Sequence, residues 1–173
     1  MEIAENLAEW KATFRSGWLA HLDATGTTDF KQYVRPRNVQ GIPGPAIDLA
    51  QSRLLVISTA GGYLRGVQEP FDAASLYGDY TLRIFPAATP LDRLAFAHDH
   101  YDRRFVKDDP QVLLPLRHLE EMAAAGRIGD LAANVISYSG YQPDVGRVVD
   151  EVIPQVLEIA HKEQAQAALL VPA

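Results

Sequence analysis

Three polar segments, each directly after an apolar run, contain the residues of this sequence that could do chemistry. They are Ser58-Thr59-Ala60-Gly61-Gly62, His98-Asp99-His100-Tyr101-Asp102 and Ser137-Tyr138-Ser139-Gly140. In open α/β sheets, ligands bind outside the carboxyl ends of the strands, and polar segments at those ends are typical of a binding site. We therefore predict that the three segments line one cleft, which binds a small molecule.

The histidine segment offers acid–base chemistry. Histidine titrates near neutral pH, so His98, His100, Tyr101 and Asp102 are the candidate catalytic residues. On an extended strand His98, His100 and Asp102 would share one face and form a His–His–carboxylate metal set, with Asp108 or Asp109 as a further oxygen ligand. A structural His98 that caps a strand end fits the pattern equally well. We predict no metal and no other cofactor.

The candidate substrate-binding residues come from the other two segments and from one aspartate: Ser58, Thr59, Gly61, Gly62, Asp109, Ser139 and Gly140. A Gly-Gly pair lets backbone N–H groups approach a carboxylate or phosphate, although a plain tight turn fits the pair as well. The pair is not part of a dinucleotide fingerprint. Neither serine lies in a G-x-S-x-G element, so a serine hydrolase is not expected.

The elements that position these segments follow from the hydrophobic pattern. Apolar residues spaced by three or four predict an amphipathic helix over 2–23, with Trp10, Phe14 and Trp18 facing the protein body or a second subunit. A Pro- and Gly-rich arm follows. Apolar runs predict strands over 54–57, 81–85, 94–98, 131–138 and 167–171 and helices over 114–125 and 144–162, the last with a kink at Pro154.

Strands that alternate with helices predict an α/β fold, in which a single three-layer domain with a mostly parallel sheet follows the N-terminal amphipathic helix. We predict a helix and arm over 1–48 and the α/β domain over 49–173. A chain of 173 residues fits about one such domain.

Composition limits the classes of partner and location. The chain has 16 Lys and Arg, 22 Asp and Glu, a net charge of −6 and no basic cluster, which argues against nucleic acid and anionic membranes. No apolar run approaches the ~20 residues that span a bilayer. The sequence opens without a secretory signal, so we expect a cytoplasmic protein. It contains no cysteine, so these residues supply no thiol nucleophile.

Further short motifs accompany the polar segments in a fixed order. They are Pro70-Phe71-Asp72, Gly78-Asp79, Arg83-Ile84-Phe85-Pro86, Asp109 to Leu116, Gly126-Arg127-Ile128-Gly129 and Ala168-Leu169-Leu170-Val171-Pro172. Together the set resembles the selenoprotein B subunits of glycine, sarcosine, betaine and D-proline reductases. The resemblance covers the chain from about Arg53 onward, outside the N-terminal helix and arm. It departs at Gln111, where the family tends to have an asparagine.

The resemblance implies reductive cleavage of a small molecule by a selenol or thiol. In the family, a selenocysteine or cysteine follows the last strand. Because the sequence stops at Ala173, where that motif would begin, we expect a UGA codon directly downstream and no reductase activity from this chain alone. Three alternatives stay open: a natural homologue without the redox residue, a non-redox enzyme or binding protein that uses the same cleft, and a scaffold subunit. The scaffold would form a homodimer or join a reductase complex.

Overall fold

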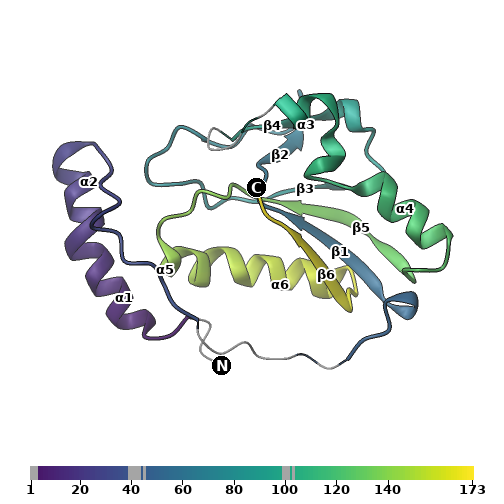
Figure 1. Ribbon diagram of the computed structural model, residues 1–173, viewed down its shortest axis with the longest axis horizontal. Coiled ribbons are helices and arrows are strands. Elements are labelled where there is room, and N and C mark those ends of the chain that lie inside the picture. The colour runs from purple at the N-terminus through teal and green to yellow at the C-terminus, as the bar shows by residue number, and fades with distance from the viewer. Residues whose placement is uncertain (1–3, 39–43, 45, 99–101, 103) are drawn as a thin grey trace.

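The computed structural model describes residues 4–38, 44, 46–98, 102 and 104–173. Its main sheet has four strands in the order β3-β5-β1-β6 (Figure 1). The central β1 (Arg53–Ser58) pairs in parallel with β5 (Asp130–Ser137) and with β6 (Ala167–Val171). The edge strand β3 (Arg83–Pro86) is antiparallel to β5. The prediction of an α/β fold with a mostly parallel sheet is confirmed.

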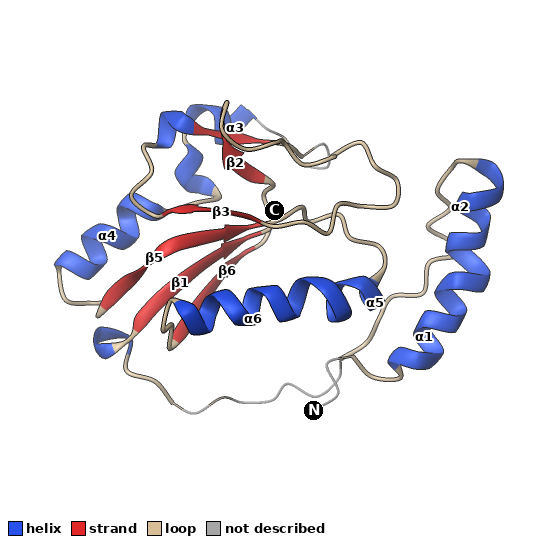
Figure 2. Ribbon diagram, turned by 180° about the vertical axis from the view of Figure 1, so that it is seen from behind, coloured by secondary structure: helices blue, strands red, loops and turns tan. Residues whose placement is uncertain are grey.

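Helices cover both faces of this sheet. Successive residues of β1 point to opposite faces, as in any strand. Leu54 and Val56 share a core with the helix α4 (Leu116–Ala124). Leu55 and Ile57 form a second core that packs against the long helix of the other layer. Figure 2 shows this layer, the helix α6 (Ile153–Lys162), lying along the sheet.

That long helix is built from three segments in one run: α5 (Val145–Arg147), a π-helical stretch (Val148–Val152) and α6 (Ile153–Lys162). Asp144 begins it by accepting a hydrogen bond from the Arg147 N–H. At Pro154, where the sequence predicts a kink, the structure passes from π- to α-helical hydrogen bonding. Proline lacks the N–H that a regular ladder needs, and such a change is a common response.

The N-terminal helix lies beside α5, the first segment of the long helix (Figures 1 and 2). It consists of α1 (Leu7–Phe14), a π-helical turn (Arg15–Leu19) and α2 (Ala20–Thr25), and it ends at Gly26. Its apolar stripe is buried, as predicted, against Tyr33 and α5. Lys11 contacts Asp150 at 2.7 Å, and the Tyr33 hydroxyl donates to the Pro143 carbonyl at 3.0 Å.

The strand predicted over 94–98 does not join the main sheet. It is β4 (Leu94–Phe96), which pairs antiparallel with β2 (Gly62–Leu64) in a separate two-stranded sheet. The chain leaves the main sheet at Gly61, which has a left-handed conformation with φ of 65°. It continues as β2, and β4 later runs back antiparallel to β2. The predicted strand end at His98 is therefore a β-hairpin-like return and not the carboxyl end of a parallel strand.

Short helices complete the chain. The helix α3 (Arg104–Asp108) precedes α4, and 3₁₀ turns lie at Leu49–Gln51, Leu91–Arg93 and Pro110–Val112. Among the described residues, none of the helices combines the length and the apolarity that crossing a membrane requires.

Candidate functional site

Two of the three polar segments meet where the parallel strands end. Ser58 and Ser137 are register partners at the ends of β1 and β5, and Val171 ends β6 on the other side of β1. Just beyond, Ala60 and Ser139 form an isolated antiparallel bridge. The strand-end rule thus placed the first and third segments side by side.

Gly61 links the strand that leads to His98 with the carboxyl ends of the parallel strands. Its N–H donates to the Tyr138 carbonyl at 3.0 Å, and its carbonyl accepts from the Ala97 N–H at 2.9 Å. A Cβ on Gly61 would lie 2.3 Å from the Ala97 oxygen, so only glycine fits there. The sequence left an anion site and a tight turn open at the Gly-Gly pair, and in the structure the Tyr138 carbonyl occupies the N–H of Gly61. The tight-turn interpretation describes Gly61.

His98 is 4% exposed and lies against the Ser139-Gly140 segment. A Cβ placed on Gly140 would be 3.3 Å from His98 Nε2 and 3.3 Å from Thr59 Oγ1. The imidazole and the hydroxyl therefore border the same small space above Gly140. We call these residues and the buried Ser139 the strand-end cluster: Thr59, His98, Ser139 and Gly140.

The end of β6 reaches the same cluster. The Thr59 N–H donates to the Val171 carbonyl at 3.1 Å, and Thr59 Oγ1 accepts from the Ala173 N–H at 2.8 Å. Thr59 thus binds the backbone of both Val171 and Ala173, and its hydroxyl lies on the side of Gly140 that His98 Nε2 also borders. The bond between Thr59 and Ala173 joins residues 114 positions apart in the sequence. The pattern of apolar runs predicts where β6 ends but not this bond.

Ser58, Ser137 and Gly62 lie beneath the strand-end cluster. Both serines are fully buried, and Ser58 Oγ donates to the Leu113 carbonyl at 3.1 Å. Ser137 Oγ has no hydrogen-bond partner among the described residues, and a Cβ on Gly62 would approach it to 3.4 Å. These three positions shape the floor of the cluster, and a substrate does not reach them in this conformation.

Two other predicted site residues take part in local capping. Asp102 is exposed and binds Arg104 at 2.6 Å, and this guanidinium holds the pKa of the Asp102 carboxyl below its usual value. Asp109 accepts from the Gln111 N–H at 2.9 Å and begins the 3₁₀ turn. His100 and Tyr101 lie outside the described residues. Within the described part of the chain, no three His, Asp or Glu side chains gather as metal ligands would.

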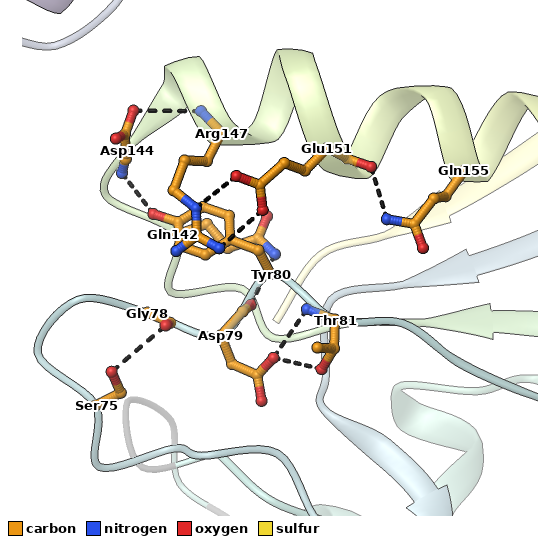
Figure 3. Close-up of polar contacts among 10 residues, drawn as sticks. All are labelled: Ser75, Gly78, Asp79, Tyr80, Thr81, Gln142, Asp144, Arg147, Glu151 and Gln155. Carbon is orange, nitrogen blue, oxygen red and sulfur yellow. Dashed lines mark hydrogen bonds and ion pairs between the residues drawn. The ribbon is translucent and has the colours of Figure 1, made fainter.

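The sequence did not single out Tyr80 as a site residue, although it binds Asp144 at the end of the loop that follows Ser139 and Gly140 (Figure 3). The buried Tyr80 hydroxyl accepts from the Asp144 N–H at 2.7 Å, and the Arg147 guanidinium lies 3.9 Å from the ring centroid. Burial raises the pKa of this phenol well above its usual value. Arg147 is held in turn by Glu151. A lone tyrosine in a loop carries no sequence signal of this kind.

The Gly78-Asp79 motif packs against the loop that follows β5. Gly78, with φ of 83°, passes so close to the Tyr141 carbonyl that a Cβ would lie 2.7 Å from its oxygen. The Asp79 carboxylate accepts hydrogen bonds from the Asp72 N–H at 3.0 Å and from the N–H and hydroxyl of Thr81. The Asp79 carbonyl accepts from the Gln142 amide.

We expect Asp79→Asn to lower the free energy of unfolding by about 1 kcal/mol at pH 7, the usual net value of one hydrogen bond, because asparagine has only one acceptor oxygen for the three donors. Partial burial raises the pKa of Asp79, but the bonds from Thr81 and Asp72 outweigh it and leave this pKa below its usual value. The stabilisation is therefore complete above about pH 4 and is lost as the pH falls through the folded-state pKa. Urea unfolding at pH 7 and at pH 3 measures the effect. The exposed Asp108→Asn is the control, and equal losses in both variants would contradict the prediction.

A larger cleft lies on the outer side of the small sheet. Its volume is about 440 Å³, and it is lined by β4 and α3, with Arg65 and Lys107 among its side chains. It adjoins the strand that leads to His98 but does not contain the strand-end cluster. The strand-end cluster contains residues of all three polar segments, and a single cleft around these segments stays a prediction. Thr59, His98, Ser139 and Gly140 form a shallow, mostly buried cluster beside this cleft.

These features define a class of protein: an α/β chain with a polar cluster at the carboxyl ends of its parallel strands. A family comparison narrows the class. Residues 31–169 match the family model of the glycine/sarcosine/betaine reductase selenoprotein B proteins, and the chain belongs to this family. The predicted resemblance is confirmed, and the match begins earlier than expected, inside the arm.

Two curated proteins are similar to this chain. The sarcosine reductase complex component B subunit beta of Peptoclostridium acidaminophilum is 27% identical over 107 residues, which are 60% of this chain and 24% of that protein. The D-proline reductase subunit gamma of Acetoanaerobium sticklandii is 23% identical over 123 residues, 71% of this chain and 49% of that protein. The chain thus covers less than half the length of each relative. No solved structure gives a significant match.

Proposed function

We propose that this chain is a subunit of a reductase complex and that its strand-end cluster binds a small substrate for reductive cleavage. Family membership and the two relatives support the reductase class. Their names point to a small amino acid, such as sarcosine or D-proline, as the substrate class. The proposal includes the cytoplasmic location that the sequence analysis predicts.

One observation supports the cluster above the other surfaces. Thr59 holds the Ala173 N–H at 2.8 Å while its hydroxyl and His98 Nε2 border one space. In the reaction that the family resemblance implies, a selenolate or thiolate attacks the substrate and displaces a leaving group, and a second thiol resolves the adduct. The 173 residues contain no cysteine, so the nucleophile comes from a residue joined after β6 or from a partner subunit. A residue joined after Ala173 would start beside His98.

Each polar group of the cluster then has a defined task. The His98 imidazole donates a proton to the leaving group as the bond to it breaks, and histidine suits this task near neutral pH. The Thr59 hydroxyl positions the segment after β6. Gly140 keeps the imidazole and the hydroxyl close together, because a Cβ there would lie 3.3 Å from each and would push them apart. Ser139, buried on the β-bridge to Ala60, fixes this arrangement.

Ligand binding tests the proposal on the chain itself. Titration with sarcosine, betaine and D-proline is expected to shift the amide signals of Thr59 and Gly140 in ¹H–¹⁵N spectra. The Gly140→Ala variant fills the space that both groups border and is expected to abolish the shifts. The Gly44→Ala variant is the matched control for a glycine-to-alanine change, since nothing lies within 4 Å of its Cβ position and its φ is not left-handed. Shifts confined to the cleft beside β4 would contradict the assignment of the site.

A further inference from the structure

The two edges of the main sheet differ in their protection. Natural sheets protect an exposed edge with charge, with proline or with a covering segment. The β3 edge contains Arg83 and Pro86, and β2 lies against it. At the other edge, β6 has the sequence Ala-Ala-Leu-Leu-Val, without charge or proline. In the described ranges no strand pairs with its outer side. The edge at β6 is therefore an open template for another strand.

The backbone groups of this edge are set for pairing. The Val171 carbonyl accepts from Thr59 and so points toward β1. Peptide groups alternate in direction along a strand, so the N–H and C=O groups of Ala168 and Leu170 point away from the sheet. A neighbouring strand would find two donors and two acceptors there.

Apolar side chains border the edge on both faces. On the α6 face, Leu170 is 64% exposed and Leu157 is 52% exposed. On the α4 face, an apolar trough of about 550 Å³ runs between β6 and α4, and the exposed Ile47 and Leu49 continue it. An apolar border around unpaired backbone groups is typical of a protein–protein interface.

We propose that β6 pairs antiparallel with β6 of a second copy of this chain, about a two-fold axis at Leu169. This register places Ala168 opposite Leu170 of the partner subunit and uses every outward N–H and C=O group of both residues. The large exposed leucine then covers the small alanine, so the strand is complementary to itself. A shift of the two-fold axis to Leu170 would set Pro172, which has no N–H, opposite Ala168.

The area required by a stable dimer favours the same face. Such interfaces bury about 800 Å² on each partner, more than a five-residue strand edge provides. The trough and the α6 border lie directly beside the strand and extend the contact on both faces. The tryptophan stripe of the N-terminal helix does not compete for this role, because the chain itself buries it.

Solution mass tests the dimer. Light scattering of the chain at about 100 μM is expected to give twice the mass of 19.1 kDa. Leu170→Lys places a charge on each side of the two-fold axis and is expected to raise the dissociation constant at least about tenfold. Ile84→Lys, on the exposed face of the opposite edge strand β3, is the matched control and is expected to leave the dimer intact. A monomer in the parent chain, or an unchanged dimer in Leu170→Lys, would overturn the proposal.

A cross-link tests the register. Leu169 would face its own copy in a non-hydrogen-bonded pair, with Cα atoms about 4.5 Å apart, which is within the range of a disulfide. The chain has no cysteine, so Leu169→Cys introduces a single thiol. Mild oxidation is expected to give a covalent dimer from Leu169→Cys and none from Ile84→Cys. Equal yields from the two would refute the pairing. If Leu170→Lys fails to fold, Ala168→Pro removes an outward N–H without breaking the bonds to β1 and is expected to weaken the dimer too.

Discussion

Replacing Trp18 by alanine is expected to lower the free energy of unfolding by about 3–5 kcal/mol, the usual cost of truncating a large core aromatic. Trp18 is 1% exposed. Its ring stacks on Phe14 with centroids 5.4 Å apart and meets the edge of Tyr33 at 5.9 Å. These contacts connect the N-terminal helix to the segment that follows it. Truncation of Trp18 therefore leaves a cavity in the centre of this aromatic cluster. Chemical denaturation of the two chains measures the difference.

Phe30 provides the matched control for Trp18. It belongs to the same aromatic cluster, with its centroid 6.2 Å from that of Trp18, but it is 59% exposed. Phe30→Ala is therefore expected to cost less than about 1 kcal/mol, because little apolar surface returns to water. Comparable losses in the two variants would show that burial in this cluster does not determine its stability. A loss of the dimer in Trp18→Ala without a loss of stability would place the helix at the subunit interface instead.

The core elements could be predicted from local pattern. Leu54 to Ile57 form a continuous apolar run, and the structure buries this run on both faces of β1. The stripe of Trp10, Phe14 and Trp18 has helical spacing, and the structure confirms the helix. Both signals are periodic and need no knowledge of distant residues. This explains why the helices over 114–125 and 144–162 were also predicted close to their observed bounds.

The placement of β4 could not be predicted in this way. Its apolar residues resemble those of a core strand, but its partner is decided by the turn at Gly61 and by the bond from Ala97 to Gly61. A hydrophobic pattern states that a strand is half-buried and does not state which strand it joins.

The candidate site was predicted in part. The strand-end rule placed Thr59 and Gly140 together, and His98 lies with them although it follows a different sheet. Asp102 and Asp109 were included because they are polar and close in sequence, and the structure shows that each caps a local turn. Tyr80 was missed because its bond to Asp144 spans 64 residues. Only the fold shows such a contact.

The second large effect concerns the chemistry. We expect the 173-residue chain to show no thiol-dependent reductase activity, because it contains no cysteine. The same chain, followed by a tail in which a cysteine or selenocysteine comes directly after Ala173 and a further cysteine a few residues on, is expected to cleave a small amino acid substrate. The assay measures the released product with a dithiol as reductant. Equal activity without the tail would contradict the proposed role of the segment after β6.

His98→Ala in the extended chain is expected to lower kcat by about 10²-fold or more, the usual contribution of a general acid. The imidazole is a titratable group beside Thr59 and Gly140, where the substrate is proposed to lie. His161→Ala is the matched control, because this exposed histidine lies in the last turn of α6, close to the start of β6 and thus at the other end of the sheet. It is expected to leave kcat unchanged.

Thr59→Val separates positioning from proton transfer. Valine keeps the shape of threonine but removes the hydroxyl that accepts from the Ala173 N–H. Loss of a residue that positions the nucleophile is expected to lower kcat about tenfold and to leave the shape of the pH profile of kcat unchanged. Loss of the general acid removes one limb of that profile. His98→Ala should therefore change the shape of the profile and Thr59→Val only its height. An extended chain indifferent to both substitutions would exclude the strand-end cluster from catalysis and move the site to the cleft beside β4.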